Sequence, residues 1–255
     1  MRKFLLIPGV VLLALLTALC ARAQLAPPSL SVAEQYLFSA INQERADRHL
    51  APVRLDAALT QAAVFHAQQM VAHGTISHRF ADEPELSARG AAAGAHFELI
   101  TENVAEGATA VSVQDAWMRS PGHRANILDA AVDAVGISVL TRDGVLYAVE
   151  DFQRTVQSLT LEQQEAAVGL LLDQAGLELV PSEDARRTCA MSTGYAGDEQ
   201  PAFVVRYTTA NLALLPSQLT KRLGAGKDHR VAVGACAPAR GGSFSTYSIA
   251  VVLYP

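Results

Sequence analysis

Hydrophobic side chains recur at helical spacing in the segment that begins near residue 31. From residue 31 onward, apolar residues such as Leu37 and Ile41 return every three or four positions, which predicts an amphipathic helix. Ser31 followed by Glu34 forms the pattern of a capping box, in which each side chain satisfies a backbone amide at the start of the helix. We therefore expect a helix that begins directly after Ser31.

Two further helices are predicted along the same segment. Asp56 is a typical N-cap and Gly74 a typical helix end, so residues 57–73 between them should form a long helix. Residues 111–118 carry a third helical pattern, and the segment "FELITENVAEG" before them is interpreted as extended.

An antiparallel hairpin follows these helices. Residues 134–140 and 145–152 alternate between apolar and less apolar positions, as strands do. The Asp143-Gly144 pair between them is a strong hairpin signal because both residues tolerate a positive φ. Helices followed by an antiparallel hairpin predict the α+β class.

A second small α+β unit is predicted over residues 158–255. It opens with the helical stretch "SLTLEQQEAAVGLLLDQAGL" and continues with strand-like runs that include residues 202–209 and 247–254. Its length is usual for a domain. The sequence shows no internal repeat that would relate it to the first unit.

The N-terminal segment predicts export. Residues 1–23 have a basic start, an apolar run and an Ala21-Arg22-Ala23 end, as in a signal peptide, and residues 24–30 form a leader. An uncleaved anchor is the alternative, but the run is short for a membrane span of about 20 residues. We expect a secreted or periplasmic protein with no stable membrane span after cleavage.

Composition and cysteine usage agree with an exported globular protein. The chain is 50% hydrophobic and 18% charged, enough for a packed core. Removing Arg2, Lys3 and Arg22 changes the net charge from −5 to −5 − 3 = −8, and no basic run remains to bind nucleic acid. Cleavage also leaves Cys189 and Cys236, which predicts one disulfide; two buried free thiols are the alternative.

A series of motifs in the first unit resembles a known family. "INQERADRHLAPVRLDAALTQAAVFHAQQM", "ISH", "TENVAEG", "SPGHRANIL" and "YAVEDF" occur in an order similar to that of the CAP superfamily (cysteine-rich secretory proteins, antigen 5 and pathogenesis-related 1, or SCP domain), bacterial type. The resemblance places a CAP domain at residues 31–157 and implies an α-β-α sandwich. It does not extend into residues 158–255.

The resemblance also implies a cleft where imidazoles and carboxylates gather. The residues that match the family's pattern are His78, Glu102 and His123, while Ser120 stands where a second Glu is usual. Two imidazoles and one carboxylate suit zinc or another divalent metal, with a position left for water. Secondary cleft residues are Ser120, Asn103 and Arg124.

A structural interpretation of the same residues remains open. Ser120 and Pro121 are typical of a helix start, at the N-cap and the first helical position. Glu102 could accept hydrogen bonds from neighbouring amides and pin its loop. In the metal interpretation, by contrast, Glu150 or Asp151 could substitute for the absent second Glu. His66 is expected to be a buried, hydrogen-bonded histidine and Trp117 a core residue.

The function expected from the sequence is that of a secreted, non-enzymatic CAP protein. It would bind an unknown small molecule, lipid or protein at the His/Glu cleft, with or without a divalent metal. Two alternatives stay open: a metal-dependent hydrolase of peptide or cell-wall material, and a structural envelope protein.

Overall fold

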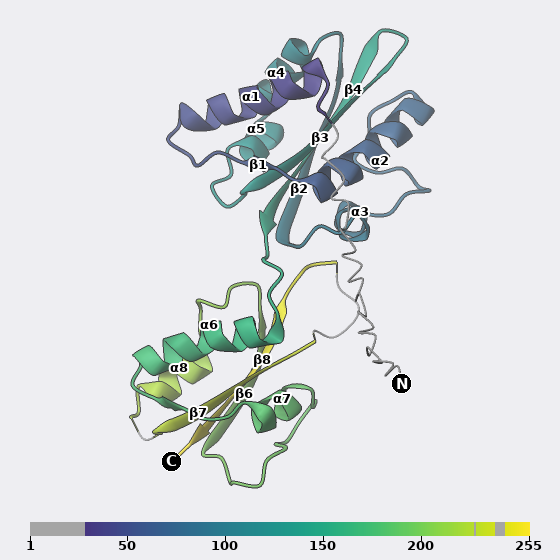
Figure 1. Cartoon of the computed structure of the whole chain (residues 1–255). Coiled ribbons are helices and arrows are strands. Elements are labelled where there is room, and N and C mark those ends of the chain that lie inside the picture. The colour runs from purple at the N-terminus through teal and green to yellow at the C-terminus, as the bar shows by residue number, and fades with distance from the viewer. Residues whose placement is uncertain (1–28, 227, 238–242) are drawn as a thin grey trace, which may run out of the picture.

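The computed structural model describes residues 29–226, 228–237 and 243–255, which form two units joined by a short connection (Figure 1). The predicted signal peptide and most of the leader lie outside these residues. Within the described part of the chain, no helix is both long enough and apolar enough to cross a membrane.

The first unit is an α-β-α sandwich, as predicted. Its four-stranded sheet has the order β1-β3-β4-β2, in which β1 pairs with β3 in parallel and the other pairs are antiparallel. Helices α1 and α2 lie on opposite faces of this sheet (Figure 1). The elements are α1 (Val32–Ala46), β1 (Arg54–Leu55), α2 (Ala57–His73), α3 (Leu86–Ala92), β2 (Phe97–Gly107), α4 (Ala110–Arg119), α5 (Pro121–Ile127), β3 (Ala134–Arg142) and β4 (Val145–Thr155).

The helix boundaries follow the predicted caps. Both halves of the capping box at Ser31 and Glu34 are present. The Asp56 carboxylate accepts hydrogen bonds from two backbone amides of α2, at 3.0 and 3.1 Å. Gly74 ends α2 in the left-handed conformation with φ 67°, which glycine adopts without steric cost. These boundaries are therefore local properties of the sequence.

The hairpin of β3 and β4 sets which side chains face each helical layer. Asp143 and Gly144 have φ values of 52° and 77°, as the predicted turn requires. Successive strand residues point to opposite faces of a sheet. Val149 therefore packs with the core beneath α2, whereas Phe152 packs with that beneath α1.

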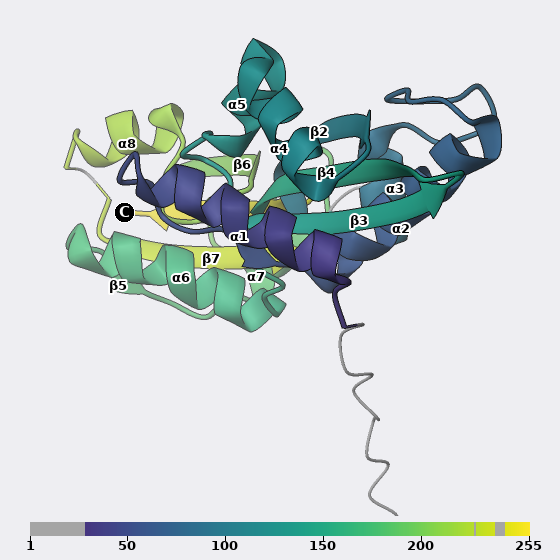
Figure 2. The same cartoon turned by 90° about the horizontal axis from the view of Figure 1, so that it is seen from above.

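A large aromatic residue anchors the layer of α1 and α4. Trp117 is fully buried and belongs to the same core cluster as Leu37, Ile41 and Phe152. The expectation that it packs in the core is confirmed. Helix α4 leads directly into α5, which projects at the edge of the unit (Figure 2).

The second unit is also an α+β sandwich. Its sheet has the order β5-β7-β8-β6, and Cys189 and Cys236 form the predicted disulfide, with a Cα–Cα distance of 5.8 Å. Helices α6 and α8 share one core cluster and α7 another. The elements are α6 (Leu161–Gln174), β5 (Glu178–Leu179), α7 (Glu183–Cys189), β6 (Phe203–Thr209), α8 (Ser217–Leu223), β7 (Arg230–Cys236) and β8 (Tyr247–Tyr254).

The segment before β8 contacts the first unit. The Ser245 amide donates to the Phe97 carbonyl at 2.8 Å, and the rings of Phe97 and Phe244 meet edge to face at 5.4 Å between centroids. The Tyr247 hydroxyl donates to the Gln157 carbonyl of the connection at 2.5 Å. Contacts beyond the covalent connection therefore join the two units.

Candidate functional site

The junction of α4 and α5 places His123. Ser120 ends α4 and precedes α5 in an extended conformation, and Pro121 occupies the first helical position, as predicted. The Ser120 side chain, however, makes no capping hydrogen bond. Arg124 closes the junction instead, because its Nη1 donates to the Met118 carbonyl at 2.9 Å. His123 thus lies in the first turn of α5 because of backbone geometry.

Glu102 and His78 form the centre of the site. Glu102 lies on β2 and His78 in the loop after α2, and Oε1 of Glu102 lies 2.9 Å from Nδ1 of His78. The carboxylate side chain is 3% exposed and the imidazole 61% exposed, so one group is fixed and the other reaches solvent. The hydrogen bond to Glu102 raises the pKa of His78 above its ordinary value.

His123, the third of the predicted site residues, lies next to His78. The His78 and His123 rings lie 6.2 Å apart between centroids and are inclined at 53°. Partial burial, and then the charge of His78, lower the pKa of His123. The structure therefore brings His78, Glu102 and His123 to one place, although they are distant in sequence. Of the two imidazoles at this place, His78 has a raised pKa and His123 a lowered one.

Two asparagine side chains hold the backbone at His123 and Glu102 in place. The Asn103 side chain is fully buried, and its Nδ2 donates to the His123 carbonyl at 3.1 Å and to Glu150 at 3.4 Å. Nδ2 of Asn126 donates to the Glu102 carbonyl at 3.2 Å and to Oδ1 of Asn103 at 2.9 Å. Asn103, predicted as a secondary site residue, is thus a positioning residue that ties α5 to β2.

Glu102 belongs to a buried network of charged side chains. Its second carboxylate oxygen, Oε2, accepts a short hydrogen bond from Nη2 of Arg89 on α3. Nη1 of Arg89 also pairs with Glu83 at 3.2 Å, and Arg89 and Glu83 are both buried. Fully buried His66 contacts Glu83 at 2.9 Å and the Ser77 carbonyl at 2.7 Å, which confirms the expectation of a hydrogen-bonded histidine.

Sequence reasoning did not assign Arg89 or Glu83 to the site. Both lie in a stretch of mixed composition around a short helix, where no periodicity marks them as inward-facing. The signal that could have indicated them is His66, because a buried imidazole needs polar partners. The network commits both oxygens of Glu102, one to His78 and one to Arg89.

The acids on β4 face opposite ways. Asp151 pairs in register with Glu102, and Glu150 pairs with Asn103. Burial raises the pKa of Asp151 well above its usual range, and the charge of nearby Glu102 adds to that effect. Burial also raises the pKa of Glu150, against the hydrogen bond from Asn103. Of the two acids, Asp151 therefore lies beside Glu102 on the same face of the sheet. Its raised pKa favours the protonated form.

The donor set fits a metal poorly. Zinc sites use imidazole and carboxylate ligands whose lone pairs are free to coordinate. Here one oxygen of Glu102 faces a guanidinium and the other an imidazole nitrogen. Across the ranges that the structure describes, no three His, Cys, Asp or Glu side chains come together in a way that could hold a metal ion.

Comparison with known families agrees with this geometry. Residues 38–152 match the family model for CAP, the cysteine-rich secretory protein family. The matched segment contains all three residues of the site and the elements from α2 to β3, together with β4 as far as Phe152. These residues form a CAP domain. The bacterial-type assignment made from the motifs is confirmed.

Proteins similar to this CAP domain come from several bacteria. The chain is 30% identical over 113 residues to the uncharacterized protein YkwD of Bacillus subtilis, and the match covers 44% of each chain. Among solved structures, an outer surface protein of Borrelia burgdorferi is 25% identical with a TM-score of 0.45, covering 48% of this chain and 92% of that one. An extracellular SCP-domain protein of Bacillus anthracis is 24% identical with a TM-score of 0.45, covering 48% and 40%.

Proposed function

We propose that the protein is an exported, non-enzymatic binding protein whose CAP domain engages its ligand at the face formed by His78 and His123. The observation that carries this proposal is the commitment of Glu102. Its Oε1 holds Nδ1 of His78 and its Oε2 is held by Arg89, so the carboxylate orients an imidazole and is not free to act on water. A general base must be able to reach the proton that it removes.

The chemistry of the exposed face favours a polar ligand. His78 keeps Nε2 for a ligand because Nδ1 is committed to Glu102. The raised pKa of His78 makes this nitrogen a donor at mildly acidic pH, whereas the lowered pKa of His123 keeps the second imidazole neutral. Together they offer a charged donor beside a neutral ring that can donate or accept.

The hydrolase alternative has one observation in its favour. A carboxylate that orients an imidazole through Nδ1 is also the arrangement that positions a general base in serine hydrolases. His78 with Glu102 has that form, so His78 would be the base of a metal-independent hydrolase. The metal-dependent form is less well supported, because Arg89 competes for the carboxylate.

The test compares the wild type with a His78→Ala/His123→Ala double variant. A His73→Ala/His229→Ala double variant is the matched control, because it also removes two imidazoles. Each protein is screened by NMR against a library of small polar fragments, titrated with zinc, and incubated with peptide substrates and peptidoglycan. We expect fragments that shift the imidazole signals of His78 and His123, no stoichiometric zinc and no hydrolysis.

Each readout can contradict the proposal separately. Hydrolysis by the wild type that is lost only in the His78/His123 variant would establish an enzyme. Tight zinc binding with the same dependence would restore the metal site. A library without any fragment that binds at the two imidazoles would refute the binding role.

A further inference from the structure

The two units share one architecture. In each, an opening helix precedes a short strand that pairs in parallel with the third strand of the unit, and the strand orders β1-β3-β4-β2 and β5-β7-β8-β6 correspond position by position. Helices α1 and α6 both begin with a capping box. The second unit is thus a smaller repeat of the CAP sandwich, which the sequence did not reveal.

A pair of glycines fixes how the two units correspond. A Cβ on Gly136 of β3 would lie 2.1 Å from the Leu59 backbone, at the third residue of α2. A Cβ on Gly234 of β7 would lie 2.1 Å from the Ala185 backbone, at the third residue of α7. Each helix therefore packs directly on its sheet, and glycine is needed because a side chain would occupy the place of the helix backbone.

This correspondence places an arginine where the CAP domain has its central carboxylate. Across the first sheet, Gly136 pairs with Asp151, which pairs with Glu102. Across the second, Gly234 pairs with Ala250, which pairs with Arg206. Glu102 reaches the loop after α2, and Arg206 likewise reaches the end of α7 and the loop after it. The charge at the equivalent position is reversed.

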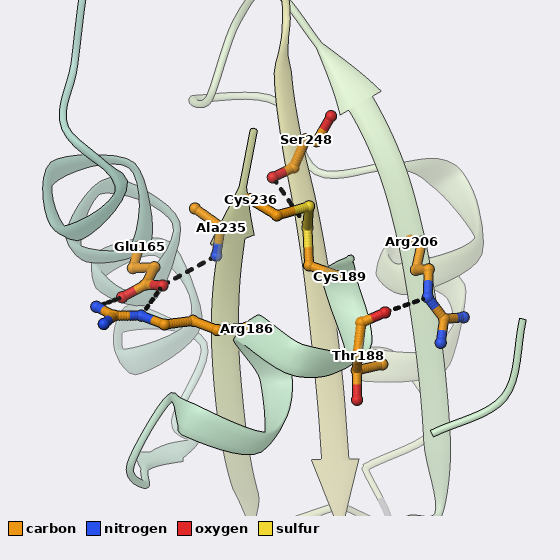
Figure 3. Close-up of a disulfide and its surroundings, with 8 residues drawn as sticks. All are labelled: Glu165, Arg186, Thr188, Cys189, Arg206, Ala235, Cys236 and Ser248. Carbon is orange, nitrogen blue, oxygen red and sulfur yellow. Dashed lines mark hydrogen bonds and ion pairs between the residues drawn. A yellow bond between two sulfur atoms is a disulfide. The ribbon is translucent and has the colours of Figure 1, made fainter. Parts of the chain in front are cut away.

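The positive charge of Arg206 is not neutralised by its described partners. Its Nε donates to the Thr188 carbonyl at 2.7 Å, and its Nη2 donates to the Gly194 carbonyl (Figure 3 shows the first bond). Neither acceptor carries a formal charge. Within the described ranges, no carboxylate lies within ion-pair distance of Arg206, in contrast to Arg89, Arg186 and Arg222.

A cavity opens beside this guanidinium. Its volume is about 330 Å³, and Cys189 of the disulfide is part of its lining. Figure 3 shows this disulfide together with Arg206 and Ser248. The walls are Cys189, Arg206, Tyr207, Thr208, Ser248 and Ile249. The lining thus combines one uncompensated cation with the hydroxyls of Thr208 and Ser248, and no acidic residue contributes to it.

We propose that this cavity is a second ligand site, which binds an oxyanion such as a phosphate or sulfate group. A guanidinium and neighbouring hydroxyls are the donors that recognise such groups. The disulfide holds the end of α7 against the end of β7 and keeps the cavity wall in place. The site is separate from the imidazole face of the CAP domain and does not depend on the function proposed for it.

The experiment titrates the full-length mature protein with inorganic phosphate, followed by NMR, with ionic strength held constant by sodium chloride. We expect saturable shifts of the Thr208 and Ser248 amide signals, and competition by sulfate. Thr208→Asp places a carboxylate at the cavity without removing a bond of Arg206, and should weaken phosphate binding at least tenfold. Thr141→Asp, at an exposed strand position of the CAP domain, is the matched control and should bind as the wild type does.

Arg206→Gln tests the cation itself. Because Arg206 also holds two carbonyls, the folding of the Arg206→Gln variant is checked by the melting temperature and by the intact amide spectrum of the second unit. If the folded variant keeps the wild-type dissociation constant, the proposal is wrong. It is equally wrong if phosphate gives no saturable shift at Thr208 and Ser248, or if Thr208→Asp binds like Thr141→Asp.

Discussion

The buried acid Asp151 gives a quantitative test of the site's electrostatics. Neither oxygen of its carboxyl meets a hydrogen-bond donor, and burial together with Glu102 raises its pKa well above the usual range. In the unfolded chain the same group ionises near its ordinary pKa of about 3.9. Above that pH the folded state therefore retains a proton that the unfolded state has lost.

The sign and size of the effect follow from proton linkage. The stability contributed by Asp151 is fully present below its unfolded pKa and is lost as pH rises toward its folded pKa. Over that range the free energy of unfolding falls by about 1.4 kcal/mol per pH unit for each such acid. The pKa of Glu150 is raised in the same direction, so at pH values between the unfolded and folded pKa of both acids the pair contributes a fall of about 2.7 kcal/mol per pH unit.

The assay is urea unfolding of the wild type, Asp151→Asn and Asp143→Asn at several values between about pH 5 and 6. Histidines such as His123, whose pKa is lowered in the folded state, contribute to the slope of all three proteins alike, so the variants are compared with the wild type. Asp151→Asn keeps the shape of the side chain and removes the titration, so its stability should fall with pH less steeply than that of the wild type, by about 1.4 kcal/mol per pH unit. Asp143 is exposed, and its variant should keep the wild-type slope. An unchanged slope in Asp151→Asn would refute the reasoning.

Three further predictions concern single contacts. Glu102→Gln replaces the carboxylate whose hydrogen bond, and then charge, raise the pKa of His78, so an NMR titration should show the His78 pKa fall, and an unchanged value would contradict the assigned hydrogen bond. Gly136→Ala should destabilise the CAP domain in urea by more than about 3 kcal/mol, on the order of a severe packing defect, whereas Gly122→Ala, with open space around it, should have little effect. Reducing the disulfide should lower stability by about 4 kcal/mol on the chain-entropy estimate; an unchanged urea midpoint would show that the bond does not constrain the unfolded chain.

The local features of the CAP domain could be predicted because they depend on residues near one another in sequence. The capping box at Ser31, the glycine end of α2 and the Asp143-Gly144 turn each follow from backbone preferences of the residues themselves. The motif order then identified the domain, and with it His78, Glu102 and His123.

The partners of those residues were decided by tertiary structure. Arg89 commits an oxygen of Glu102 because α3 packs beside β2, and nothing in the local sequence around Arg89 indicates that contact. The direction of Asp151 depends on strand register, since a shift by one residue would turn it to the other face.

The sequence by itself determined helices α1, α2, α4, α5 and α6, the hairpin, the family of the first unit and the cysteine pair. Only the tertiary structure showed that the second unit repeats the first. Helix packing on Gly136 and Gly234 preserves a backbone arrangement, and many different sequences satisfy such an arrangement. A charge reversal from Glu102 to Arg206 leaves that backbone unchanged, so the two units share a fold while their equivalent positions carry opposite charges.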